Sequence, residues 1–200
     1  MNEPHSVAKT DSGLTSLSML DRVRSADDEA WRRLVHLYSP LIYHWCQRSG
    51  LSSEDAADLM QEVWSAVSRN IARFDRASAG GTFRGWLWTI TRNKLRDFFR
   101  ARAGRITGVG GSEAQRLLTG VPVDEPASEP AETSNLIHRA LEMIRRDFEP
   151  RTWTAFWRTA VEGCAAGDVA AELHLSVDAV YQAKSRVLRR LREELHGLAD

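Results

Sequence analysis

The sequence predicts an all-α protein in which two small helical domains are joined by a flexible acidic linker. Three observations lead to this fold class. Apolar residues recur at intervals of three or four over most of the chain, no segment alternates like a half-buried strand, and an aperiodic stretch rich in glycine and proline separates two helical regions. The domains are expected at residues 20–103 and 136–196, with the linker at residues 104–135.

Consecutive helices are predicted in the first domain. Acidic residues 27–29 stand at a helix start, where the helix dipole stabilises negative charge. Pro40 either kinks the helix that follows or divides it into two. After Gly50, Ser52 or Ser53 can cap the next helix, because a serine hydroxyl accepts a hydrogen bond from a free amide of the first turn.

The segments outside the two domains lack helical periodicity. Residues 1–19 are polar and are expected to form a mobile N-terminal tail. The linker carries five glycines and three prolines between residues 104 and 134, and within residues 106–135 Arg116 is the only basic residue against five acidic ones. A stretch of this composition either wraps the domains or floats between them, since it has too few apolar residues for a core of its own.

Charge is balanced overall but unevenly placed. The chain has 27 basic and 27 acidic residues, which argues against a histone-like polycation. Residues 84–105, however, hold seven basic residues against Asp97 alone, and Lys184–Arg192 holds five with no acidic residue. Such local concentrations of basic residues favour a nucleic-acid partner.

Several classes of function lack their required residues. Cys46 and Cys164 lie in different halves without clustered His/Cys spacing, so we expect no metal, no disulfide and no cofactor. No glycine-rich phosphate loop or nucleophile-base pair is recognisable, and we do not expect an enzyme. The sequence shows no secretion signal and no apolar run of membrane-spanning length, which predicts a cytoplasmic protein without a membrane span.

A helix-turn-helix is predicted near the C-terminus. Asp168–Leu175 has the pattern of a short helix, and Ser176 can cap a longer one whose buried stripe is Val180, Val187, Leu191 and Leu195. Its second helix would enter the major groove of DNA. The alternative is an ordinary solvated amphipathic helix. The candidate DNA contacts lie off the buried stripe: Tyr181, Gln182, Ser185, Arg186 and Arg189.

A basic, aromatic helix is predicted at Phe83–Arg102. Its cations are spaced to neutralise phosphates, and an exposed amide at Asn93 could recognise the edge of an unpaired base. Aromatic residues here could stack on bases or form the core; we expect Phe83, Trp86 and Phe98 in the core, whereas Trp88 falls off the main apolar stripe. The candidate DNA contacts are Arg84, Trp88, Arg92, Asn93, Arg96 and Arg100.

The helix before it is acidic. It carries Asp55, Asp58, Gln61 and Glu62 and has no basic residue until Arg69. Because an acidic face repels DNA, this helix is either a protein-docking surface or a plain solvated face. The residues alone leave these two alternatives open.

Residues 20–196 resemble the extracytoplasmic-function group of the sigma-70 family of bacterial RNA polymerase sigma factors. The resemblance rests on residues 58–63 (DLMQEV), on Phe83–Leu87 (FRGWL) with Ile90 and Asn93, and on the helix-turn-helix with residues 175–177 (LSV). It implies that residues 20–103 form a sigma-2 domain and residues 136–196 a sigma-4 domain.

The resemblance also assigns roles to the three candidate surfaces. Asp58, Gln61 and Glu62 would bind core RNA polymerase. The Phe83–Arg102 helix would open and recognise the −10 promoter element, with Asn93 on a flipped-out base. The helix from Val177 would recognise the −35 element, although Tyr181, Gln182 and Ala183 stand where basic or small polar residues are common.

The function expected from this resemblance is transcription initiation. The chain would bind core RNA polymerase, recognise promoter DNA and assist melting, and we expect the free protein to be a monomer. An anti-sigma factor is left open as a further partner. The main alternative is a stand-alone helix-turn-helix transcriptional regulator that binds palindromic duplex as a dimer. A second is a polymerase-binding module without promoter activity.

Overall fold

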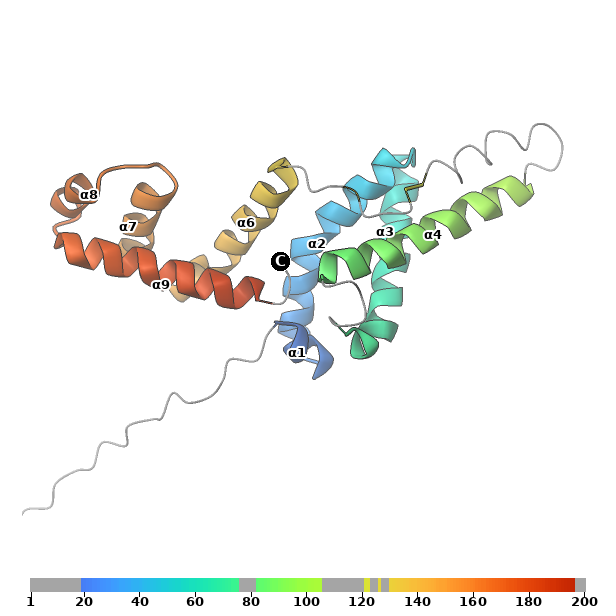
Figure 1. The fold of residues 1–200 in the computed structure, drawn as a ribbon, viewed down its shortest axis with the longest axis horizontal. Helices are drawn as coiled ribbons and strands as arrows, with labels where there is room; N and C mark the ends of the chain where they lie inside the picture. Colours follow the sequence, from blue (N-terminus) through green and yellow to red (C-terminus); the bar gives the residue numbers. More distant parts are fainter. Residues whose placement is uncertain (1–18, 76–81, 106–120, 123–125, 127–129, 197–200) are drawn as a thin grey trace, which may run out of the picture.

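The described part of the protein is built from helices alone. The computed structural model describes residues 19–75, 82–105, 121–122, 126 and 130–196, and these residues contain no strand (Figure 1). The elements in chain order are α1 (Met19–Arg24), α2 (Asp28–Arg48), α3 (Ser53–Asn70), the 3-10 turn η1 (Ile71–Arg73), α4 (Phe83–Arg105), α6 (Pro130–Ile144), η2 (Arg145–Asp147), α7 (Pro150–Ala160), α8 (Ala166–Glu172) and α9 (Val177–Leu195). The predicted all-α, two-domain fold class is confirmed.

Local sequence signals set the helix starts in the first domain. The Asp27 carboxylate accepts hydrogen bonds from the amides of Glu29 and Ala30 at the start of α2, and the Ser52 hydroxyl accepts one from the amide of Asp55 in α3. α2 is one continuous helix that includes Pro40. An internal proline costs a helix about 3 kcal/mol; burial of flanking residues such as Ile42 offsets this cost.

Aromatic contacts join α2, α4 and the segment after η1 in the first core. Phe83 at the start of α4 is fully buried and meets Tyr38 of α2 edge-on, with ring centroids 5.1 Å apart. Phe74, which follows η1, lies 5.7 Å from the same Phe83 ring. Val121 is only 3% exposed and belongs to this core, so the connection between the domains is attached to the first domain at that point.

The second domain forms around α7 and α9. Trp153 and Phe156 of α7 pack with Ile144 of α6 and Val187 of α9. A smaller cluster of short side chains, including Ala155, Val169, Ala170, Val180 and Ala183, joins α7, α8 and α9. Small residues let these three helices approach closely, which fixes the direction of α9 relative to α8.

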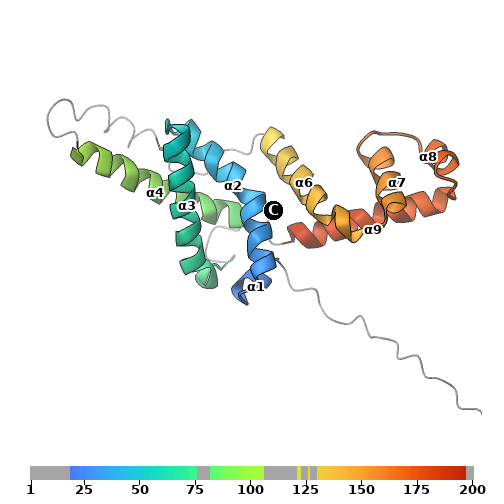
Figure 2. The same cartoon turned by 180° about the vertical axis from the view of Figure 1, so that it is seen from behind.

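The two helical domains touch each other. α6 packs against α2 as well as α9, and the C-terminal end of α9 reaches α2 in both views (Figures 1 and 2). α6 begins at Pro130, inside the expected linker, because proline suits the first position of a helix. The expected mobile tail lies outside the described residues except for Met19, which is buried in α1, and most of the linker lies outside them too. None of the described helices has the length and apolar character needed to cross a bilayer.

Removal of the Phe83 ring should destabilise the first domain. Phe83→Ala would leave a cavity among α2, α4 and Phe74, and it should lower the free energy of unfolding by about 3–5 kcal/mol. Urea unfolding followed by circular dichroism measures this change. Thr89→Ala, on an exposed position of the same helix, is the control and should change stability little; equal stability of both variants would contradict this account of the core.

Candidate nucleic-acid interface

One face of α9 carries all five residues predicted to contact duplex DNA. Tyr181, Gln182, Ser185, Arg186 and Arg189 are exposed, and Tyr181 is 59% exposed despite its size. They recur at intervals of one, three or four residues, so they form one continuous surface. Val180, Ala183 and Val187 are buried on the opposite side. The arrangement matches a helix presented outward by its own domain.

The turn between α8 and α9 is held by three local features. His174 has a φ of +50°, in the left-handed region that favours glycine. The Ser176 hydroxyl accepts a hydrogen bond from the amide of Ala179 at 3.1 Å, which caps α9 as predicted. The guanidinium of Arg151 on α7 donates hydrogen bonds to the carbonyl oxygens of Leu173 and His174, each at 2.8 Å.

Arg151 is a positioning residue that sequence reasoning missed. It lies more than twenty residues from the turn and is an exposed arginine without a recognisable motif. Its Nη2 donates to both Leu173 and His174. The contact supplies hydrogen-bond donors to carbonyl oxygens at the end of α8 that would otherwise depend on water. It therefore connects α7 directly to the turn that sets the direction of α9.

A second exposed surface lies on α4. Asn93 and Arg100 are exposed, while Arg92 and Arg96 are half-buried beside them. Arg92, Arg96 and Arg100 follow each other at intervals of four, so their side chains lie on one side of the helix. Arg100 also pairs with Asp97 at 3.1 Å. This side of α4 offers an amide and three guanidiniums in a row.

Two residues of the predicted α4 set are not free surface groups. Trp88 is 2% exposed and packs edge-on against Trp45 at 5.2 Å, so the prediction that its ring contacts DNA is wrong. The cause is the rotation of α4, which turns Trp88 toward α2. Arg84 pairs with Glu132 of α6 at 3.0 Å, and its guanidinium lies 5.4 Å from the centre of the Trp45 ring.

The acidic face of α3 borders a groove against α4. Asp58, Gln61 and Glu62 are all exposed. The groove has a volume of about 570 Å³ and is lined by Asp55, Asp58, Leu59, Glu62, Asp97, Phe98, Ala101 and Arg102. Lys94 of α4 pairs with Glu62 at 3.0 Å, but Asp58 has no ion pair among the described residues. Four carboxylates against one guanidinium give this groove an acidic lining.

The described residues offer no site for a metal ion, since no three of their His, Cys, Asp or Glu side chains are grouped for one. Both cysteines are free. Burial raises the pKa of the Cys46 thiol to about 12, because the thiolate would lose its hydration. Cys46 is therefore a protonated core residue at neutral pH.

Loss of the Arg151 contact should loosen the helix-turn-helix turn. In Arg151→Ala the carbonyl oxygens of Leu173 and His174 lose their donors, and amide hydrogen exchange in residues 173–176 should accelerate by about tenfold, which corresponds to about 1.4 kcal/mol for a typical charged hydrogen bond. Hydrogen-exchange mass spectrometry measures it. Arg145→Ala, an exposed arginine of η2, is the control, and equal exchange in both variants would refute the positioning role.

The chain is similar in sequence to known proteins over most of its length. Residues 34–105, which include α3 and α4, match the family model described as Sigma-70 region 2. The chain is 27% identical over 166 residues to the ECF RNA polymerase sigma factor SigE of Mycolicibacterium smegmatis, a match that covers 83% of this chain and 62% of the relative. It is 28% identical over 178 residues to the RNA polymerase sigma factor CnrH of Cupriavidus metallidurans, with 88% and 90% covered.

A third relative is more distant in sequence. The ECF RNA polymerase sigma factor BldN of Streptomyces coelicolor is 23% identical over 179 residues, a match that covers 88% of this chain and 64% of the relative. The matched regions span less than two thirds of SigE and BldN but nearly all of CnrH. With its region 2 match and these relatives, the chain is similar to the extracytoplasmic-function group of sigma-70 family RNA polymerase sigma factors.

Proposed function

We propose that this chain is a sigma factor that binds core RNA polymerase through α3 and directs it to promoters through α4 and α9. The observation that carries the proposal is the separation of three exposed faces, one acidic and two basic, on one chain. Asp58 lies on an acidic face, Asn93 on a basic face, and Arg186 on a second basic face in the other domain. A factor that joins a protein partner to two segments of DNA requires this division.

The acidic face of α3 suits a protein partner better than DNA. Asp58, Gln61 and Glu62 project from a helix whose other side is fixed in the core by Leu59 and Val63. Because the backbone of this helix is already ordered, binding a partner would restrict only the charged side chains. The partner surface would be basic, and the roughly 570 Å³ groove beside α4 could receive one of its side chains.

The exposed side of α4 suits a single strand of DNA. Arg92, Arg96 and Arg100 would follow the phosphates, and binding should weaken as salt rises because each contact releases counterions. The Asn93 amide can donate and accept at once, so it can pair with the edge of a base that has left the stack. Trp88 takes no part in this set because it is buried.

The outer face of α9 suits the major groove of a duplex. Tyr181, Gln182 and Ser185 lie toward the N-terminal half of the helix, where a recognition helix contacts bases. Arg186 and Arg189 follow, where guanidiniums can bind phosphates or guanine. These are the proposed −35 contacts, and the −10 contacts belong to α4.

Promoter opening follows from this division of binding. α9 would bind duplex DNA, and α4 would bind the unpaired strand, so binding energy favours the melted state over the closed one. Removing a base from the stack costs a few kcal/mol, which the α4 contacts must supply. Nucleotide addition belongs to the polymerase.

A dimeric stand-alone regulator is not favoured, since the relatives are named sigma factors. The free chain is proposed to be a monomer in the cytoplasm, and an anti-sigma factor would be an additional partner.

A charge reversal on α3 tests the polymerase contact. Asp58→Arg should weaken binding to core RNA polymerase at least tenfold, about 1.4 kcal/mol, because a repulsive charge replaces an attractive one at the interface. Immobilised core polymerase and a titration of each variant measure this. Glu172→Arg makes the same change on an exposed position of α8 and should bind like wild type. If immobilised core polymerase retained both variants equally, α3 would not be part of the interface.

Substitution of the α4 amide tests promoter opening. Asn93→Ala should reduce open-complex formation on the order of tenfold while polymerase binding is unchanged, since a well-paired base contact contributes about 1–3 kcal/mol. Permanganate reactivity of thymines measures opening, on a promoter selected from genomic DNA by in vitro transcription with the wild type.

The control for this experiment lies one turn earlier. Thr89 is exposed on α4, and Thr89→Ala should open the promoter normally. Normal opening by Asn93→Ala would mean that this amide does not contact a base. Absence of any promoter-dependent transcript with the wild type would overturn the proposed function itself.

A further inference from the structure

The contact between the two domains includes apolar packing. Ala140 of α6 is fully buried in the core of the first domain. Leu136 and Met143 of α6, with Leu191 and Leu195 of α9, also pack against that core. α6 and α9 therefore cover a side of α2 that would face water if the domains stood apart (Figure 2). Apolar contact alone is non-directional and does not fix how the domains are aligned.

A buried carboxylate supplies the alignment. Glu194 in the last turn of α9 is only 4% exposed, which is rare for a glutamate. Both of its carboxylate oxygens accept from Nη1 of Arg33 on α2, at 3.0 and 3.1 Å. Arg190, one turn earlier on α9, pairs with Glu194 at 2.7 Å. We call the contact of Arg33 with Glu194 the interdomain ion pair.

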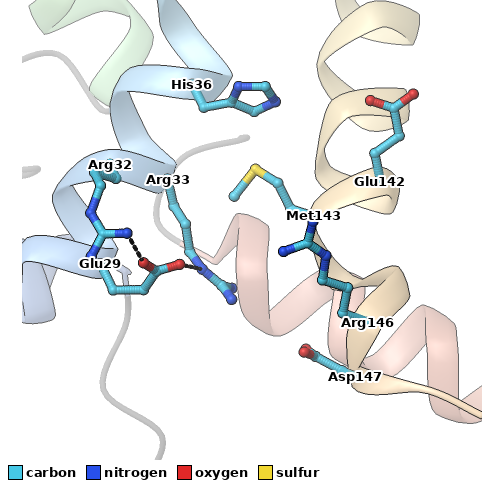
Figure 3. Close-up of a pocket in the computed structure, with 8 residues that line it drawn as sticks. All are labelled: Glu29, Arg32, Arg33, His36, Glu142, Met143, Arg146 and Asp147. Atoms are coloured by element: carbon cyan, nitrogen blue, oxygen red, sulfur yellow. Dashed lines mark hydrogen bonds and ion pairs between the residues drawn. The ribbon is translucent and has the colours of Figure 1, made fainter.

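The partners of Glu194 are themselves held in position. Arg33 also donates to Glu29 on its own helix at 3.2 Å, and Arg190 pairs with Asp147 of η2 at 2.9 Å. Burial lowers the pKa of the Arg33 guanidinium, but attraction and hydrogen bonding to Glu194, together with the contributions of Glu29 and Asp147, outweigh this and leave the pKa above its ordinary value. Figure 3 shows Arg33 and Glu29 on α2 facing Arg146 and Asp147, which follow α6, across a cavity of about 350 Å³.

Glu194 can be satisfied in two states. With the domains in contact it has both arginines; with the domains apart it keeps Arg190 on its own helix and gains water. Opening would therefore not leave the carboxylate buried and unpaired. In a closed chain without Arg33, by contrast, Glu194 would stay buried with only one of its two arginine partners. This asymmetry makes the ion pair a contact that can break reversibly.

A second ionic contact lies nearer the N-terminal end of α6. Glu132 pairs with Arg84 of α4 at 3.0 Å and lies 3.4 Å from His44 of α2. Arg84 was predicted to contact DNA, so the closed arrangement occupies one cation of the α4 helix. The two ionic contacts, from α6 and α9, hold the second domain on the first.

We infer that the free chain is a closed unit in which the α2 surface around Arg33 is the docking surface for the chain's own second domain. The interdomain ion pair specifies this closed arrangement. A partner that engages the two domains at another separation must first break it, so the closed state lowers the apparent affinity of that partner by the fraction of chains that are open. Only the identity of the partner rests on the proposed function.

The test compares two neighbouring arginines of α2. Arg33→Glu and Arg32→Glu change the net charge equally, but Arg32 is 71% exposed and pairs with Glu29 on its own helix at 2.7 Å. Small-angle X-ray scattering of the full chain measures the radius of gyration and the maximum dimension. Arg33→Glu should increase both, and Arg32→Glu should leave both at the wild-type values. Unchanged helical circular dichroism excludes unfolding.

Two milder variants support the same test. Arg33→Met keeps most of the aliphatic stem without the charge, and Glu194→Gln removes the charge on the other side. Each should open the chain, and the double variant should open it no further than the singles, because both remove one contact. Equal scattering by wild type, Arg33→Glu and Arg33→Met would overturn the inference, and so would additive effects.

Binding to core polymerase separates this inference from the proposed function. If both hold, Arg33→Glu should bind core polymerase more tightly than Arg32→Glu does. If neither the wild type nor Arg33→Glu binds polymerase while the scattering still differs, the interdomain ion pair stands and the sigma-factor mechanism fails. If Arg33→Glu opens the chain without any gain in affinity, polymerase accepts the closed form. That result would overturn the inference that the closed state lowers the affinity for this partner.

Discussion

Burial of α2 on two sides is the constraint on which the rest of the structure depends. One side, with Leu34 and Ile42 fully buried, forms the core with α3 and α4. The other side carries Arg33 and receives α6 and α9. A helix between two partners cannot rotate to improve one interface without disturbing the other. The positions of the acidic α3 face and of the second domain are therefore linked through a single element.

Acidic and basic residues gather on separate faces of α3 and α4. α3 presents Asp58, α4 presents Arg96 and Arg100, and ion pairs such as Lys94 with Glu62 join the two helices where they meet. The pairing neutralises the adjoining edges and leaves the outer faces charged. A surface arranged in this way can bind a basic protein and an acidic polymer without the two partners sharing contacts.

Features set by neighbours in sequence were predictable, and features set by distant neighbours were not. The capping roles of Ser52 and Ser176 and the buried stripe of α9 depend on residues within one or two turns, so periodicity and capping rules identify them. Trp88 was misassigned because α4 carries aromatic residues on several sides, and only packing on Trp45 decides which side is inward. The residue-by-residue roles in polymerase and DNA binding remain predictions.

Contacts between distant segments left no signal in the sequence. Glu194 looks like one more acidic residue at the end of an amphipathic helix, and nothing nearby indicates that a guanidinium over a hundred residues away would bury it. Val121, another such distant contact, limits how far the second domain can move from the first. Because it is fixed in the first core, only residues 122–129 join that point to α6. Nine Cα–Cα steps lead from Val121 to Pro130, and at about 3.5 Å per step they extend to at most about 32 Å. The undocked second domain thus stays at a high effective concentration near α2, and redocking is an intramolecular event that dilution of the protein cannot weaken.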